Sequence, residues 1–217
     1  MKNLNIPLIL PASLESRRNE LEKTIILAKE RIHKFAENYN WQNLMKKSFM
    51  DEVRIFDNKQ SFDAVLLEMN NMDLSTKLPK TYSACLENRI LMAVSPEIFL
   101  QNYPEGEEDS FFEKLLAHEI AHRLHIRILN GDEEAMGPVW FYEGFAVYAA
   151  GQFQDPDLQL ALKDVLQIIN DPKRGSYRKY GFVLRYLLQK ISLPEMVQKA
   201  EDGNFNKWIS ELVKELF

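Results

Sequence analysis

The sequence predicts an α+β fold in which a small mixed sheet is followed by a mostly helical half. Short alternating or continuous apolar runs, typical of strands, lie between residues 52 and 94. After residue 110, apolar residues recur at intervals of three and four, as amphipathic helices require. The length of 217 residues fits one domain, 1–217, with a helix-and-sheet part over 1–109 and a helical part over 110–217.

The N-terminal part begins with a predicted helix over residues 13–48, where apolar residues recur at helical spacing. Residues 52–56 (EVRIF) alternate and predict a strand, and residues 59–69 return to a helical pattern. Residues 82–94 predict two strands joined by a turn at Glu87-Asn88.

A short helix over 96–100 and an acidic loop over 102–109 are expected next. The following helix, 110–129, begins with Ser110 and Glu113 at the spacing of a capping box and is stopped by an Asn-Gly pair. Five more helices are expected toward the C-terminus, over residues 140–151, 157–169, 177–191, 194–201 and 206–216.

The composition excludes several classes of protein. A net charge of −5 without a long Lys/Arg cluster argues against nucleic-acid binding. No apolar run reaches the roughly 18 residues of a membrane span. The apolar stretch Leu4–Leu10 is broken by Pro7 and is short for a secretory signal. The single cysteine, Cys85, cannot form an intrachain disulfide and suits a reducing compartment, so a cytoplasmic location is expected.

The segment AHEIAHRLHI, residues 117–126, carries two histidines four positions apart, His118 and His122, with Glu119 beside the first. On a helix such histidines share a face one turn apart, so two imidazoles can converge on one metal ion. Glu119 lies about 100° round the helix from His118, where it can reach a bound water. The alternative is a pair of histidines that bind no metal.

A catalytic zinc usually has a third protein ligand. The segment VWFYEGFAVYAA, residues 139–150, offers Glu143 in an otherwise apolar helix. A carboxylate buried there is costly unless it is paired or bound to a metal. The alternative is a partly exposed glutamate before a glycine.

The segment HEIAH, followed 21 positions later by the glutamate of WFYEGFA, resembles the gluzincin metallopeptidases. The likeness is closest to the aminopeptidase N family and its compact relatives, and thermolysin is more distant. The resemblance implies a thermolysin-like zincin domain with one catalytic Zn²⁺. It implies that Glu119 is the general base and that the zinc ligands are His118, His122 and Glu143.

The segment SYRKYGFVLRYLL, residues 176–188, is similar to the part of that family around its catalytic tyrosine. Tyr177 and Lys179 match in place, whereas Tyr180 stands where glycine is usual and Gly181 comes one position late. The resemblance therefore implies Tyr177 as the oxyanion donor, with Tyr180 as its rival. The alternative for Tyr177 is a surface aromatic at the start of a helix.

The expected function is zinc-dependent hydrolysis of a peptide or protein substrate, with Glu119 moving the proton and Tyr177 stabilising the oxyanion. The substrate is expected to lie extended at a sheet edge along strand 89–94. The segment CLEN, residues 85–88, is also similar to the motif with which aminopeptidases hold a free N-terminus, although it can equally be a simple hairpin turn. The candidate substrate-binding residues are Glu87, Arg89, Leu91 and Ala93. Two alternatives stay open: an inactive zincin-fold binding protein, and a zinc hydrolase of a non-peptide amide or ester. Endopeptidase and aminopeptidase activity are not distinguished.

Two positions near the motif do not fit a ligand role. His125 shares the face of His118, but seven residues rise about 10 Å, so it cannot bind the same ion and is expected to be half-exposed. Thermolysin-like proteins place an aspartate four residues after the ligand glutamate to orient a histidine, and this chain has Val147 there. Any partner that orients a ligand must therefore come from elsewhere.

Overall fold

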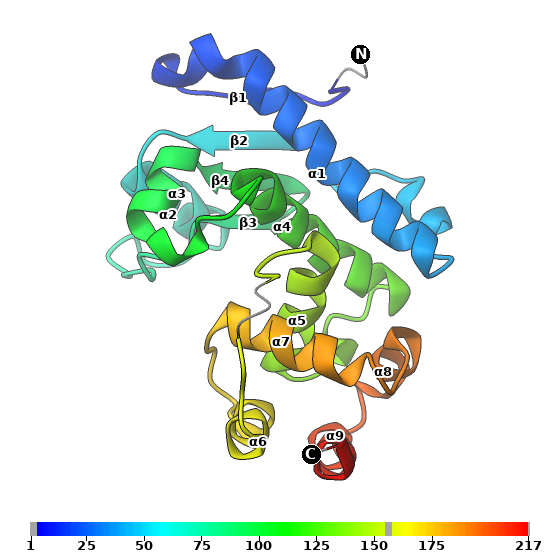
Figure 1. The fold of residues 1–217 in the computed structure, drawn as a ribbon. Coiled ribbons are helices and arrows are strands. Elements are labelled where there is room, and N and C mark those ends of the chain that lie inside the picture. The colour runs from blue at the N-terminus through cyan, green and yellow to red at the C-terminus, as the bar shows by residue number, and fades with distance from the viewer. Residues whose placement is uncertain (1–3, 155–157, 217) are drawn as a thin grey trace. The chain divides into compact units, whose positions relative to one another are not determined.

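The computed structural model describes residues 4–154 and 158–216, which form the expected α+β arrangement (Figure 1). The chain divides into two compact units. The first is Met1–Arg31 with Lys47–Ile120, and the second is Ile32–Lys46 with Ala121–Phe217. The division along the chain falls inside a helix, after Ile120, and the expected division at residue 110 stays a prediction. The single-domain organisation stays a prediction.

The first unit contains a four-stranded sheet in the order β1-β2-β4-β3. The strands are β1 (Leu8–Ile9), β2 (Glu52–Phe56), β3 (Ala84–Glu87) and β4 (Ile90–Val94). The β1-β2 and β2-β4 pairs are parallel, and the β3-β4 pair is antiparallel, so the sheet is mixed as predicted.

The turn between β3 and β4 lies one residue later than predicted. Glu87 pairs with Ile90, which leaves Asn88 and Arg89 as the two turn residues. Both have positive φ, 46° and 64°, as a type I′ hairpin turn requires. The Arg89 guanidinium donates to both carboxylate oxygens of Asp51 at 2.6 Å, which helps this residue to occupy the turn.

The long predicted N-terminal helix is shorter and begins irregularly. A 3₁₀ turn over Ala12–Arg17 leads into α1 (Arg18–Asn38), and a second turn, Gln42–Met45, follows. The break comes at Asn40, whose φ of 61° is left-handed and cannot continue a helix.

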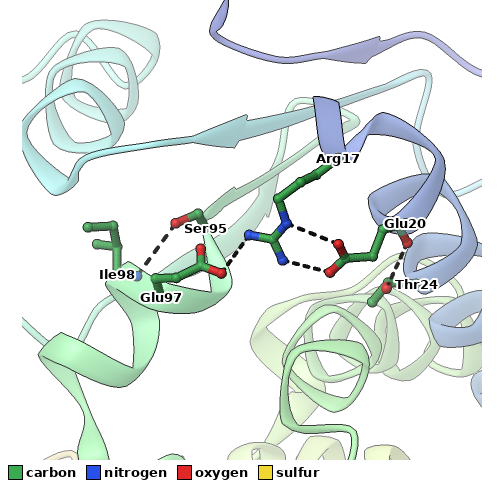
Figure 2. Close-up of polar contacts among 6 residues, drawn as sticks. All are labelled: Arg17, Glu20, Thr24, Ser95, Glu97 and Ile98. Carbon is green, nitrogen blue, oxygen red and sulfur yellow. Dashed lines mark hydrogen bonds and ion pairs between the residues drawn. The ribbon is translucent and has the colours of Figure 1, made fainter. Parts of the chain in front are cut away.

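Arg17 joins the start of α1 to α3 (Pro96–Asn102), as Figure 2 shows. Its guanidinium donates to both oxygens of Glu20 and to the carboxylate of Glu97 in α3. Ser95 caps α3 by accepting a hydrogen bond from the backbone N–H of Ile98. The predicted helix over 59–69 is α2 (Lys59–Met69), which packs on β2 and β4.

The helix that carries the histidines, α4 (Phe111–Ile128), is continuous as predicted. Its start is not the expected capping box, because Ser110 has a φ of 56° instead of an extended backbone. The Glu113 carboxylate is bound by Arg31 of α1, at 2.6 Å. The predicted Asn-Gly stop is confirmed, since Asn130 and Gly131 both have positive φ.

The second unit is helical. Its helices after α4 are α5 (Val139–Ala150), α6 (Leu162–Asn170), α7 (Tyr177–Leu187), α8 (Leu193–Lys199) and α9 (Phe205–Leu216). Of the helix expected over 157–169, residue 157 lies outside the described residues and residues 158–161 are not helical, so α6 begins later than predicted. No helix among the residues that the structure describes is long and apolar enough to cross a membrane.

Helices α5 and α7 approach each other closely at two glycines. A Cβ on Gly144 would lie 3.1 Å from the carbonyl oxygen of Tyr180, and one on Gly181 would lie 2.5 Å from Cγ1 of Val147. Packing therefore accounts for Gly181, the glycine that comes one position later than in the aminopeptidase motif.

Candidate metal centre

Helices α4 and α5 bring together the three residues predicted as metal ligands. One ligand atom each of His118, His122 and Glu143 lies within 4.8 Å of the others. Because α4 runs unbroken through both histidines, they lie on one face, a single turn apart. The described residues thus contain a group that could hold a metal ion.

The separation of two of these atoms suits a tetrahedral ion. Nε2 of His122 lies 3.4 Å from Oε2 of Glu143. Two ligand atoms bound about 2.1 Å from zinc at a tetrahedral angle lie about 3.4 Å apart. Two imidazoles and one carboxylate are also a donor set typical of catalytic zinc. The residues present therefore fit the metal that the motif predicts.

Glu143 is almost fully buried, with a side chain 2% exposed, so the alternative of a partly exposed glutamate is wrong. Its neighbours along α5 are buried and apolar: Trp140, Phe141, Phe145 and Ala146. An ionised carboxylate in such surroundings needs compensating charge. Nη2 of Arg174 supplies it 3.0 Å from Oε1, the oxygen other than the one nearest His122.

Arg174 is the residue that sequence reasoning missed. It precedes α7, and its Nη1 and Nη2 donate to the hydroxyls of Tyr177, at 3.2 Å, and Tyr142, at 3.3 Å. Burial lowers the pKa of Arg174, but the Glu143 carboxylate and the hydroxyls of Tyr177 and Tyr142 raise it by more. The net pKa is above its ordinary value, so the guanidinium stays charged. In the sequence, Arg174 is distinguished only as a basic residue three positions before Tyr177. No motif identifies it as a partner of Glu143.

The two candidate tyrosines have different surroundings. Tyr180 is buried, and its hydroxyl accepts from the backbone N–H of Gly175 and donates to the carbonyl of Lys173, so it braces the segment before α7. Burial also raises the pKa of Tyr180. The hydroxyl of Tyr177 instead contacts Arg174, which contacts Glu143. Tyr180 also interacts electrostatically with Glu143 and Arg174, so the choice of Tyr177 as the oxyanion donor stays a prediction.

Glu119 follows His118 in α4 and is only partly buried. It is close enough to Tyr82 to influence that residue electrostatically. Burial, Cys85 and the Glu119 carboxylate together raise the pKa of Tyr82. Glu119 is thus a partly exposed carboxylate directly beside a candidate ligand histidine, and its role as general base stays a prediction.

His125 is fully buried and not half-exposed as expected. Its ring stacks on Phe145, with centroids 4.2 Å apart, and meets Phe141 edge-on. Neither ring nitrogen has a hydrogen-bond partner among the described residues. Burial, with a contribution from His122, lowers the pKa of His125 to about 3. His125 is therefore a neutral core residue.

The predicted substrate strand is not at an edge of the sheet. β4 is hydrogen-bonded to β2 on one side and to β3 on the other, so its backbone is not available to an extended peptide. Leu91 and Ala93 are also fully buried. The edge strand beside β4 is β3, which includes Glu87, and Arg89 lies in the turn. Substrate contacts by these last two residues stay predictions.

Comparisons with protein-family models, curated proteins and solved structures found nothing that matches this chain. The geometry of the candidate metal centre and the motifs are therefore what indicate the function of this chain.

Proposed function

We propose that the chain is a zinc-dependent metallopeptidase of the gluzincin type, with a thermolysin-like zincin fold. The observation that carries the proposal is the close group formed by His118, His122 and Glu143, whose ligand atoms lie within 4.8 Å of one another. A pair of histidines on one helix turn and a buried carboxylate on another helix is a ligand arrangement that suits catalytic zinc.

Nε2 of His122 and Oε2 of Glu143, which lie 3.4 Å apart, would hold the ion together with a ring nitrogen of His118. When bound, zinc supplies Lewis-acid activation of a water molecule and of the scissile carbonyl. The rest of the chemistry falls to the side chains of this chain.

The Glu119 carboxylate accepts a proton from the attacking water as the new C–O bond forms. It then donates that proton to the nitrogen of the leaving amine as the C–N bond breaks. The proton is thus conserved between the two steps, and Glu119 ends as it began. The Tyr177 hydroxyl donates a hydrogen bond to the negatively charged oxygen that develops on the carbonyl carbon.

The proposal is tested by metal analysis combined with a peptide-library digest. Protein purified without chelator should contain about one zinc per chain and should cleave peptides. Chelation should abolish cleavage, and added zinc should restore it. Absence of bound zinc would refute the proposal.

The same experiment separates the two alternatives. Zinc binding without turnover of any peptide, amide or ester would indicate a binding protein. Cleavage of simple esters or amides, but of no peptide in the library, would indicate a hydrolase of another substrate class.

A further inference from the structure

The two carboxylate oxygens of Glu143 have different partners. Oε2 lies 3.4 Å from Nε2 of His122, on the side of the candidate metal centre. Oε1 lies 3.0 Å from Nη2 of Arg174. A carboxylate can bind a metal through one oxygen or through both, and a partner on one oxygen decides between these modes.

We propose that Arg174 is a positioning residue for the metal centre, which holds Oε1 of Glu143 so that Oε2 alone faces the ion. The inference rests on the proposed zinc site and names the residue that orients its carboxylate ligand. No motif in the sequence marks this partner. The aspartate that orients a histidine in thermolysin-like proteins is replaced here by Val147, so the sequence supplies no residue of that kind beside the ligands.

Arg174 is itself held in place from two sides. It donates to the hydroxyl of Tyr142, the residue before Glu143 in α5, and to the hydroxyl of Tyr177 at the start of α7. The Tyr142 ring meets the His122 ring edge-on, with centroids 5.9 Å apart. The planar guanidinium can serve three acceptors at once, whereas a lysine ammonium is a flexible point charge.

The opposite possibility is that Arg174 acts as a counter-ion, which neutralises the Glu143 carboxylate and competes with the metal for it. The geometry argues against it, because the guanidinium and His122 face different oxygens of the carboxylate. A positioning residue and a competitor predict changes of opposite sign in metal affinity when the arginine is removed. The proposal can therefore be decided by the direction of one measurement.

The experiment compares the zinc dissociation constants of wild type, Arg174→Gln, Arg174→Lys and Lys173→Gln, measured by competition with a chromophoric chelator. Arg174→Gln should weaken zinc binding by about 10- to 100-fold, the usual effect of losing a partner that orients a ligand. Arg174→Lys should bind zinc with an affinity between those of wild type and Arg174→Gln. The lysine keeps the positive charge but loses the planar set of N–H donors. Lys173→Gln removes a charge from the same segment and should bind zinc like wild type.

A spectroscopic readout separates positioning from a general effect on folding. With Co²⁺ in place of zinc, visible absorption reports the coordination number. Arg174→Gln should reduce the intensity of these bands, because a released Glu143 can bind through both oxygens. If Arg174→Gln does not fold without metal, Tyr142→Phe removes one anchor of the arginine and should weaken zinc binding by a smaller factor.

Unchanged or tighter zinc binding by Arg174→Gln would overturn the inference. If that variant does not fold, unchanged binding by Tyr142→Phe would do the same. In either case, zinc binding by the wild-type chain would leave the proposed function standing. Failure of the wild-type chain to bind zinc would overturn both.

Discussion

Nε2 of His122 and Oε2 of Glu143 lie 3.4 Å apart, although the two residues belong to different helices and are 21 positions apart in the chain. The pair lies beside a histidine of a different kind, His125, which is enclosed by aromatic rings. This contrast leads to the first prediction. His122→Ala and Glu143→Ala should bind zinc far more weakly than wild type, whereas His125→Phe should keep it. Metal analysis after gel filtration measures the difference, and full zinc in Glu143→Ala would rule out the ligand assignment.

The second prediction concerns the general base. Glu119→Gln keeps the size of the side chain but cannot accept a proton. It should retain zinc and lower kcat by at least about 10²-fold, the low end for loss of a general base. Steady-state kinetics with a cleavable peptide tests this. If zinc is lost together with activity, Glu119 is a ligand and the assignment is wrong.

The third prediction separates the two tyrosines by what each variant loses. Tyr177→Phe should lower kcat by roughly 10²-fold, the scale for one oxyanion donor, with little change in KM or in stability. Tyr180→Phe removes the hydroxyl that bonds the backbone N–H of Gly175 and the carbonyl of Lys173, two residues that are themselves exposed. It should lower the free energy of unfolding by about 0.5–1.5 kcal/mol and affect kcat less. Denaturant titrations and kinetics of both variants decide the matter, and the reverse pattern would make Tyr180 the donor.

The fourth prediction concerns stability in acid. The pKa of His125 is about 3 in the folded chain against an ordinary value of 6.5. Above pH 6.5 the His125 imidazole is neutral in both the folded and the unfolded chain. Below pH 6.5 it binds a proton in the unfolded chain but stays neutral in the folded chain until about pH 3. The free energy of unfolding should therefore fall by about 1.4 kcal/mol per pH unit between about pH 6.5 and pH 3 through this residue.

His125→Phe should lack this component, so it should gain about 2 kcal/mol on wild type between pH 7 and pH 5. Urea titrations of the metal-free proteins at both pH values measure the gain. Parallel pH dependence of the two proteins would mean that His125 titrates normally in the folded state.

The fifth prediction tests the contact between α5 and α7. Gly181→Ala would place Cβ 2.5 Å from Cγ1 of Val147, so either the Val147 side chain or one of the two helices has to shift. It should lower the free energy of unfolding by about 1–3 kcal/mol. Gly203→Ala is the matched control, because no atom lies within 4 Å of its added Cβ. Equal stability of both variants would show that this contact between α5 and α7 relaxes at no cost.

The α+β class, the unbroken helix α4 and the three candidate ligands could all be predicted from the sequence. Each depends on local physics. Apolar periodicity defines the helix, positive φ at Asn130 and Gly131 ends it, and a four-residue spacing places His118 and His122 on one face. Even Glu143 was detectable, because a lone carboxylate in an apolar helix needs a partner.

Other features were decided only by the tertiary structure. The order of the sheet places β4 between two strands, and no short stretch of sequence specifies which strands are neighbours. From its position on α4, His125 was expected to be half-exposed. In the structure, the rings of Phe141 and Phe145 of α5 pack against its imidazole and help to bury it. Arg174 reaches Glu143 across 31 residues of sequence. The positions of the histidines on α4 could be predicted from the sequence because a helix repeats every 3.6 residues. The long-range contacts depend instead on how whole elements pack, which no local pattern encodes.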